Sequence, residues 1–420
     1  MRIAHISDTH LGYEAYRTVS GGGENQRGTD IIRAFVRCVD DIVEWDPDLV
    51  IHSGDVAEKP NISVRMMLLI RQQFARLAGE RKDGTRRPLI VIAGNHDMPS
   101  ASKEACFLEL YRDMPGVEIV CVEPKVIKYD TETLSGLSVT CVPHEALKDL
   151  ALEERFEEVA PIPGRTNILV SHGVAGGSSL YRRVLGREYT IPTDVIVRDW
   201  DYAALGHWHK QGPVGATGKA WYAGSTENMG FGDLRDNGDE RGYLRVTVEH
   251  GRTDVHVRNL PIRQMLRLPV IDASEKSIEE IEEAIQQNIE KAKADNKMAG
   301  SIVGQHVTGC SREKWALVPV AKIRERANET ALYYEVTLIK PGQEEIEAVS
   351  GVKRGENIME VIEARALQID GAFDFWRLNK NATRFRQRDL HVSWFGDGGL
   401  SRCTRCSSAA SRGGHRGRGF

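Results

Sequence analysis

The sequence lacks any long hydrophobic run. Although 41% of its 420 residues are hydrophobic, no apolar stretch approaches the roughly 18 residues that a membrane-spanning helix needs. The chain also begins without the pattern of a signal peptide, since residues 2–7 already read as a strand. We therefore expect a soluble, cytoplasmic globular protein with no membrane contact.

The sequence also has few cysteines and a small net charge. The seven cysteines, an odd number, are scattered singly, which favours reduced thiols over a disulfide framework. The net charge is only −4, and the five arginines and one aspartate of residues 396–420 leave −8 for the rest of the chain. The chain therefore lacks the excess of positive charge that is typical of nucleic-acid-binding proteins. DNA binding would have to come from local geometry or from bound metal.

The first 260 residues alternate short apolar runs with helical patterns. Ile31, Phe35, Val39 and Ile42 recur at the spacing of an amphipathic helix that follows the apolar run of residues 2–7. Strand patterns dominate the later part of this region. We predict an α/β (α+β) domain over residues 1–260, in which two sheets pack face to face between helices as a four-layer α/β/β/α sandwich.

The character of the sequence changes near residue 260. Strand and helix patterns then alternate over about 80 residues, enough for a small α/β domain at 261–342. A helical pattern and a basic, aromatic stretch occupy 343–395. The Gly-, Ser- and Arg-rich residues 396–420 show no apolar period, and we expect them to be disordered.

Five apolar runs in the first 260 residues end in side chains that can bind a metal ion. These side chains are Asp8 and His10, Asp55, the Asn95-His96-Asp97 triplet, His172, and His207 with His209. Side chains at the carboxyl ends of strands converge on one crevice of an α/β sheet. The sequence therefore predicts a single site that is assembled from five separate segments.

The types of ligand indicate which metals this site would hold. Carboxylates, imidazoles and an amide oxygen suit Mn²⁺, Fe or Zn²⁺, and the lack of thiolates argues against a structural zinc site. The candidate ligands are too many for one ion with an open position, and they fit two ions that share a carboxylate. Because such pairs catalyse phosphoryl chemistry, we predict a metal-dependent phosphoesterase with two divalent ions, Mn²⁺ being the first candidate.

The motifs also resemble a known family. In order, Asp-x-His, Gly-Asp, Gly-Asn-His-Asp, His and Gly-His-x-His resemble those of the calcineurin-like metallophosphoesterases. The segments SDTHLG, GHWHKQ and YAGSTENMGFGD are similar to the SbcD-type DNA exonuclease branch of this family. The resemblance covers roughly residues 1–260 and implies that residues 261–342 occupy the position of a DNA-capping domain.

The resemblance divides the ligands between two ions. It implies that a first ion is held by Asp8, His10, Asp55 and His209. Asp55 would bridge to a second ion, whose other ligands would be Asn95, His172 and His207. His96 would face the scissile phosphate, and Asp97 could orient its imidazole.

The same resemblance implies the biological role. It points to an exonuclease or endonuclease that processes DNA ends or single strands in double-strand-break repair, with a metal-bridging hydroxide as nucleophile. It also implies two protein partners, a coiled-coil ABC ATPase of the SbcC type that docks on residues 343–395 and a second copy of the chain, bound through phosphoesterase helices.

One residue departs from the pattern of this branch. A histidine usually follows the Gly-Asp aspartate by three positions, whereas this chain has Glu58. Glu58 and the negative charge of residues 1–395 favour an alternative function, the hydrolysis of small phosphodiesters or phosphomonoesters. A further alternative is a non-catalytic scaffold of the same fold, against which the complete set of ligand positions argues.

Simpler structural roles also compete for single residues. Asp8, Asp55 or Asn95 taken alone could serve turns, and Asp97 could cap a helix that begins near residue 100. His5 and His52 lie inside strand patterns, so we expect both to be packed core histidines.

Overall fold

A computed structural model of the chain describes residues 1–16, 18, 23–99, 105–176, 189–234, 240–249 and 251–339. All of these belong to the first of two units of the chain, Met1–Ile362. The predicted segments 343–395 and 396–420 lie outside the described residues. No helix in the described part is both long enough and apolar enough to cross a bilayer.

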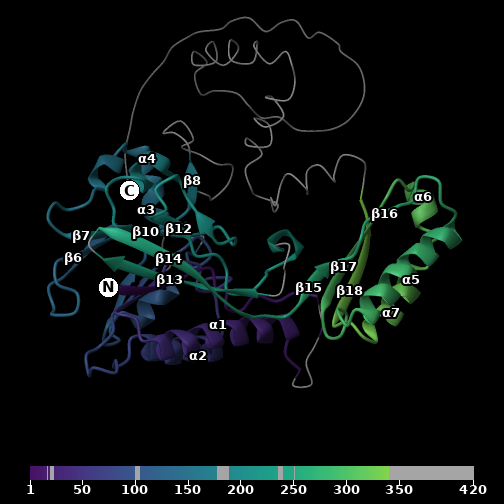
Figure 1. Cartoon of the computed structure of the whole chain (residues 1–420), viewed down its shortest axis with the longest axis horizontal. Coiled ribbons are helices and arrows are strands. Elements are labelled where there is room, and N and C mark those ends of the chain that lie inside the picture. The colour runs from purple at the N-terminus through teal and green to yellow at the C-terminus, as the bar shows by residue number, and fades with distance from the viewer. Residues whose placement is uncertain are drawn as a thin grey trace, which may run out of the picture. The chain divides into compact units, whose positions relative to one another are not determined.

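Two six-stranded sheets form the centre of residues 1–261 (Figure 1). The first sheet has the order β14-β13-β1-β2-β3-β4 and consists of β1 (Arg2–Ile6), β2 (Leu49–His52), β3 (Leu89–Ile92), β4 (Val117–Val120), β13 (Glu240–Glu249) and β14 (Arg252–Pro261). Strands β1 to β4 run parallel to one another, whereas β13 pairs antiparallel with β1 and β14. The first sheet is therefore mixed.

The second sheet is also mixed and has the order β11-β12-β10-β7-β6-β5. Its strands are β5 (Lys125–Tyr129), β6 (Leu137–Val142), β7 (Thr166–His172), β10 (Tyr202–Gly206), β11 (Gly212–Pro213) and β12 (Ala220–Tyr222). The central strands β6, β7, β10 and β12 are parallel, and the edge strands β5 and β11 are antiparallel to their neighbours. A separate small ribbon pairs β8 (Val174–Gly176) with β9 (Thr190–Pro192).

Helices cover the outer faces of both sheets. Helices α1 (Gln26–Trp45) and α2 (Val64–Leu77) lie side by side on the first sheet (Figure 1). Helices α3 (His144–Leu152) and α4 (Thr193–Ile196) pack on the second. The short 3₁₀ turns are η1 (Phe107–Tyr111), η2 (Phe156–Glu158) and η3 (Phe231–Asp233).

The alternation of side chains along the strands explains why the sheets form layers. In β2, Leu49 and Ile51 point into the core between the two sheets, while Val50 packs against α1 and α2. In β7, Ile168 shares the inter-sheet core and Leu169 faces the opposite side, toward α3. Because successive residues of a strand point to opposite faces, apolar runs of this kind need cover on both faces. The predicted α/β/β/α sandwich is confirmed.

Residues 265–339 form a further sheet with its own core. Four parallel strands, in the order β15-β17-β16 with β18 beside β17, pack against three helices. These elements are β15 (Met265–Arg267), β16 (Ile271–Asp272), α5 (Ile278–Ala294), β17 (Ile302–Thr308), α6 (Arg312–Trp315), α7 (Val320–Asn328) and β18 (Tyr333–Leu338). The domain boundaries and the DNA-capping role remain predictions.

His5 and His52 are packed core histidines, as expected. The imidazole of His5 lies 2.7 Å from Tyr202 Oη and 2.8 Å from Ser53 Oγ, so it joins the two sheets. The His52 Nε2 atom lies 3.1 Å from Thr9 Oγ1. Burial lowers the pKa of both histidines to about 3, and both are therefore neutral at physiological pH. The described cysteines are all free thiols, also as expected.

Candidate metal centre

The predicted ligands all lie at the carboxyl ends of strands or within a few residues after them. β1, β2 and β3 lie side by side and parallel in the first sheet, while β7 and β10 do so in the second. His172 ends β7 and pairs in register with Gly206, the last residue of β10. The five strand ends therefore meet at one edge of the sandwich, as the sequence predicts.

The backbone at these strand ends is held in an unusual conformation. Four of the predicted ligands have positive φ angles, namely Asp8 (50°), His10 (43°), Asp55 (53°) and His207 (101°). Residues other than glycine rarely adopt this region, and such strain persists only where the surrounding structure enforces it. Its concentration at one site indicates a functional arrangement rather than ordinary turns.

The glycines of the motifs let these segments approach one another closely. A Cβ atom on Gly94 would lie 2.1 Å from Asp55 Oδ1, and a Cβ atom on Gly54 would lie 2.3 Å from His172 Nδ1. Both distances are far below van der Waals contact, so a larger residue would push the neighbouring ligand away. The Gly-Asp and Gly-Asn-His-Asp motifs thus reflect close packing between separate strand ends.

Three groups of side chains are arranged so that they could hold a metal ion. Within each group, one ligand atom from every residue lies within 4.8 Å of the others. The groups are Asp8, His10 and His209; His10, Asp55 and His96; and Asp55, His172 and His207. Since Asp55 and His10 each belong to two groups, the cluster is continuous and long enough for two ions.

Asn95 joins two histidines of one group, and Asp55 links that group to His10. The Asn95 Oδ1 atom lies 3.1 Å from His172 Nε2 and 3.1 Å from His207 Nδ1. The Asp55 Oδ2 atom lies 3.3 Å from His172 Nε2 and 3.7 Å from His10 Nε2. The structure thus brings together every predicted ligand, with Asp55 between the two halves.

The hydrogen bonds of His172 show which of its ring nitrogens faces the cluster. His172 Nδ1 lies 2.8 Å from the carbonyl oxygen of Ser53, so it carries the proton and donates. In the neutral ring, the Nε2 lone pair then faces two oxygen acceptors, on Asp55 and on Asn95. These lone pairs repel one another unless a positive charge lies between them, which is either a proton on His172 Nε2 or a metal ion in its place, so the donor set fits a cation.

His10 and His209 form a similar arrangement in another part of the cluster. His10 Nδ1 is 2.9 Å from Glu58 Oε2, and His209 Nδ1 is 3.3 Å from Asp233 Oδ2. Both imidazoles thus point their Nε2 atoms inward, and these two atoms lie 3.1 Å apart. A carboxylate behind a histidine ligand is the usual way in which proteins orient the ring toward a metal.

The electrostatics of the cluster also favour positive charge. Burial opposes the ionisation of Asp55, but the surrounding histidines, chiefly His172, hold its pKa well below the usual value. Burial likewise opposes a charge on His172, yet Asp55 raises the pKa of His172 to about 9. Burial, together with His172, holds the pKa of His207 well below its usual value. The cluster therefore attracts positive charge beside Asp55.

The imidazole of His96 is more exposed than those of His172 and His209. Its side chain is 37% exposed, whereas that of His172 is fully buried. Its backbone N–H donates to Asp55 Oδ1 at 2.9 Å, and its Nδ1 atom lies 2.9 Å from the carbonyl oxygen of Glu58. These contacts hold the residue beside Asp55 through its backbone N–H and through Nδ1.

Asp97 has a position that the sequence did not reveal. Its carboxylate is fully buried and accepts hydrogen bonds from the backbone N–H groups of Val56, Ala57 and Gly94, at 3.2, 2.9 and 3.0 Å. Burial, with the negative charge of Asp55, raises the pKa of Asp97 to about 6. Asp97 thus joins two strand-end loops, and the Glu58 carbonyl takes the place beside His96 that was expected for Asp97. The helix start near residue 100 lies outside the described residues.

Two carboxylates of the site were missed by sequence reasoning as partners of ligands. In the sequence, Glu58 stands out only as a departure from a family pattern, and its contact with His10 spans 48 positions. Asp233 lies 24 positions from His209, within the segment YAGSTENMGFGD. No spacing rule connects either pair, so only the segment around Asp233 hinted at its importance.

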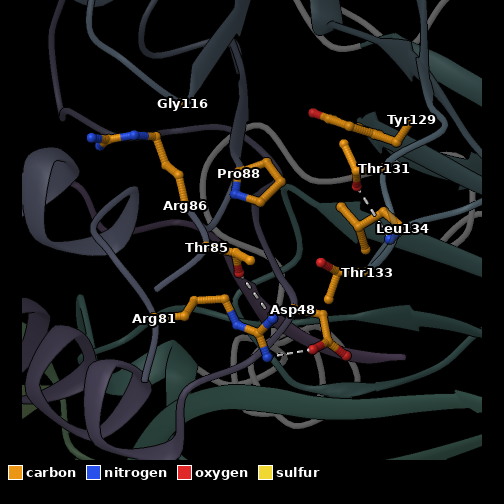
Figure 2. A pocket seen from close by; sticks show the side chains of 10 residues that line it. All are labelled: Asp48, Arg81, Thr85, Arg86, Pro88, Gly116, Tyr129, Thr131, Thr133 and Leu134. Carbon is orange, nitrogen blue, oxygen red and sulfur yellow. Dashed lines mark hydrogen bonds and ion pairs between the residues drawn. The ribbon is translucent and has the colours of Figure 1, made fainter. Parts of the chain in front are cut away.

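A separate pocket lies away from this cluster (Figure 2). It has a volume of about 230 Å³ and lies where Asp48, Pro88 and Gly116 precede β2, β3 and β4. Figure 2 shows Arg81 paired with Asp48 on its wall, and the two atoms that join them lie 2.7 Å apart. Because the pocket occupies the opposite ends of the parallel strands, it plays no part in the candidate metal centre.

Comparison with known proteins identifies relatives of the chain. Residues 1–211 match the family model described as calcineurin-like phosphoesterase. The DNA double-strand break repair protein Mre11 of Methanococcus maripaludis is 24% identical over 245 residues, which cover 56% of this chain and 60% of the relative. The protein of the same name from Sulfolobus acidocaldarius is 26% identical over 297 residues, which cover 70% of this chain and 72% of the relative.

A third relative extends the match. Mre11 of Haloferax volcanii is 25% identical over 321 residues, which cover 75% of this chain and 65% of the relative. The chain thus spans less than two thirds of the length of the M. maripaludis and H. volcanii proteins.

Proposed function

Because this chain belongs to the calcineurin-like phosphoesterase family, we propose that it is a dimetal phosphodiesterase that processes DNA ends in double-strand-break repair. The observation that carries the proposal is the shared position of Asp55, which contacts His172 on one side and His10 on the other. The distant relationship to Mre11 proteins agrees with the resemblance to the DNA-repair branch, and it supports DNA as the substrate.

Two divalent ions, Mn²⁺ in the first instance, are proposed as cofactors. The first ion would be held by Asp8, His10, Asp55 and His209. The second would be held by Asp55, Asn95, His172 and His207. When bound, such a pair supplies Lewis acidity to a phosphate and a nucleophile at neutral pH.

His96 is proposed as the residue that meets the scissile phosphate. In its protonated form, Nδ1–H remains bonded to the Glu58 carbonyl, and Nε2–H can donate to a phosphate oxygen or to the leaving oxygen. This arrangement suits a general acid, since the ring is held by one nitrogen and acts through the other. Asp97 would serve the reaction by joining the loops that carry Asp55 and His96.

One observation favours a second candidate function, the hydrolysis of small phosphodiesters or phosphomonoesters. The Glu58 carboxylate is 23% exposed and lies 3.9 Å from His96 Nδ1. A negative charge beside the proposed phosphate site penalises a polyanionic strand more than a small ester. By contrast, the convergence of every candidate ligand argues against a non-catalytic scaffold.

The experiment that separates these functions uses the full-length chain loaded with Mn²⁺. We expect end-labelled duplex DNA to release nucleotides, a chelator to abolish the release, and bis(p-nitrophenyl) phosphate to be a poorer substrate by kcat/KM. Turnover of the small diester without cleavage of DNA, by protein that retains two ions, would favour the second candidate. A protein that binds no metal would revive the scaffold.

The sheet of residues 265–339 is proposed to help hold DNA at the site. Tyr333 of β18 packs on Tyr16, with ring centroids 4.5 Å apart, in the segment that follows His10. Arg263 forms an ion pair with Asp30 of α1 and has a second contact between its Nη2 and Asp30 Oδ1 at 2.8 Å. The tyrosine contact connects this sheet to the segment that follows His10, and the Arg263 pair connects the residues just before the sheet to α1. An SbcC-type ATPase is proposed as a partner of residues 343–395, which lie outside the described residues.

A homodimer is proposed through the exposed face of α2. Val64 and Leu68, one helical turn apart, are 70% and 61% exposed, and Leu110 of η1 is 60% exposed. Leu110 lines a surface groove of about 710 Å³ together with Ile62, Met67 and Phe107, and Val64 and Leu68 directly follow two of its lining residues, Ser63 and Met67. An apolar patch of this kind is typical of a surface that a second protein covers.

Leu68→Glu is expected to convert the dimer to monomer at micromolar concentration, because a charge buried in an apolar interface weakens association by about tenfold or more. Sedimentation velocity measures the change. Leu152→Glu is the matched control, since Leu152 is 73% exposed and lies on α3. A monomeric wild type, or a Leu68→Glu protein that remains dimeric, would contradict the proposed interface.

A further inference from the structure

Glu58 occupies a position between three strand ends of the metal centre. Its backbone N–H donates to the Leu11 carbonyl at 3.1 Å, and its own carbonyl accepts from His96 Nδ1 at 2.9 Å. Its side-chain Oε2 accepts from His10 Nδ1, also at 2.9 Å. A single residue therefore contacts the segments that follow β1 and β3 while it belongs to the segment that follows β2.

The backbone around Glu58 is well placed to hold its side chain still. The N–H groups of His10 and Leu11 donate to the carbonyls of Asp55 and Val56, at 3.1 and 3.0 Å. With the Glu58–Leu11 bond, these contacts extend the parallel pairing of β1 and β2 beyond the strands themselves. The backbone that carries the carboxylate is thus hydrogen-bonded to the segment after β1 on both sides of Ala57.

The contact with His10 determines which ring nitrogen faces the metal cluster. His10 is almost fully buried, with 2% of its side chain exposed. A carboxylate on Nδ1 requires the proton at that nitrogen, so Nε2 presents its lone pair to His209 and Asp55. The negative charge also makes the ring a better donor to a cation.

We propose that Glu58 is a positioning residue that fixes His10 for one metal ion and, through its backbone carbonyl, holds His96 at the substrate face. This inference rests on the proposed function, since it assumes that the cluster binds two ions. It assigns a role to the residue that stands where the resembling branch has a histidine. A neutral histidine at this place would accept a hydrogen bond from His10 without supplying the same negative charge.

Glu58→Ala tests the part of the role that the side chain plays. We expect one of two Mn²⁺ sites to weaken by about 10- to 100-fold, the usual effect of removing a carboxylate behind a metal-binding histidine. The other site should keep its affinity. Isothermal titration of the metal-free, full-length chain with MnCl₂ measures both sites without any reference to activity.

Two further variants separate positioning from a general structural effect. Glu58→Gln keeps an oxygen acceptor for His10 Nδ1–H but loses the charge, so it should weaken the same site less than Glu58→Ala does. Glu118→Ala is the matched control, because Glu118 on β4 forms an ion pair with Lys125 at 2.8 Å and belongs to none of the metal-binding groups. It should bind both ions as the wild type does.

A kinetic measurement supplies a second, independent readout. Phosphodiester hydrolysis by Glu58→Ala should need about 10- to 100-fold more Mn²⁺ for half-maximal rate, in proportion to the lost affinity. With bis(p-nitrophenyl) phosphate as substrate, on which the charge of Glu58 has less effect than on a DNA strand, the KM at saturating Mn²⁺ should remain near the wild-type value, because the backbone carbonyl that holds His96 is unchanged. A structural defect would instead lower the rate at every metal concentration.

The outcomes of these measurements distinguish this inference from the function on which it rests. If the wild type binds two ions and Glu58→Ala binds both with equal affinity, the positioning role is overturned and the proposed function stands. The positioning role is also overturned if Glu118→Ala weakens a site as much as Glu58→Ala. If the wild type binds no Mn²⁺, the proposed function falls and this inference falls with it.

Discussion

Replacing His96 with alanine is expected to lower the rate of phosphodiester hydrolysis by about 10²- to 10⁴-fold, the range typical of a lost general acid or base, while both metal ions stay bound. The ring is 37% exposed, compared with 17% for His209, and its Nδ1 atom is held by the Glu58 carbonyl. The backbone N–H of residue 96 would still donate to Asp55 Oδ1 after the substitution, so the ligand that lies between the two ions keeps its contact.

Metal content and hydrolysis have to be measured on the same preparation of His96→Ala. Elemental analysis after desalting gives the ions per chain, and DNA end release gives the rate at saturating Mn²⁺. His256→Ala is the matched control, because His256 is an exposed histidine on β14. If His96→Ala loses an ion, then His96 acts as a ligand, a role that its grouping with His10 and Asp55 would allow. If the rate is unchanged, His96 has no role in the chemistry.

Replacing Asp55 with asparagine is expected to remove both ions and to reduce hydrolysis to background. The attraction between two unit charges 4 Å apart is about 4 kcal/mol at an effective dielectric constant of about 20, a value that also describes buried sites, so losing this carboxylate should weaken metal binding by about 10³-fold. Asparagine keeps the size of the side chain and an oxygen that can accept the His96 N–H. The loss should therefore come from charge rather than from a rearranged loop.

Titration of the metal-free Asp55→Asn protein with MnCl₂ measures this effect directly. Asp194→Asn is the matched control, because Asp194 lies on α4 with 72% of its side chain exposed. A weakening of one site alone would show that Asp55 belongs to a single ion. Unchanged binding at both sites would remove the observation on which the proposed function depends.

The layers of the fold followed from the sequence because their cause is local. Ile31, Phe35, Val39 and Ile42 recur along one face of α1, and all four are buried against the first sheet. Strand residues such as Leu49 and Val50 are buried on opposite faces. Hydrophobic periodicity of this kind depends only on the spacing of residues along the chain, so it can be recognised without knowing the tertiary contacts.

The meeting of the candidate ligands at one place followed from the sequence for a related reason. His172 and Asp55 lie far apart in the chain, yet each follows a short apolar run that reads as a strand. Parallel strands bring their carboxyl ends to one edge, so the chain direction alone places these residues together. The division of the ligands between two ions came only from the resemblance and remains a proposal.

The side chains that support these ligands could not be inferred in this way. Glu58 meets His10 across 48 residues and Asp233 meets His209 across 24, and neither distance corresponds to a helical or strand repeat. The carboxylate of Asp97 accepts hydrogen bonds from backbone amides, and it is the Glu58 carbonyl that bonds to the imidazole of His96. Periodicity specifies which face of an element is buried, but a hydrogen bond between two loops depends on how separate elements pack, and that information exists only in three dimensions.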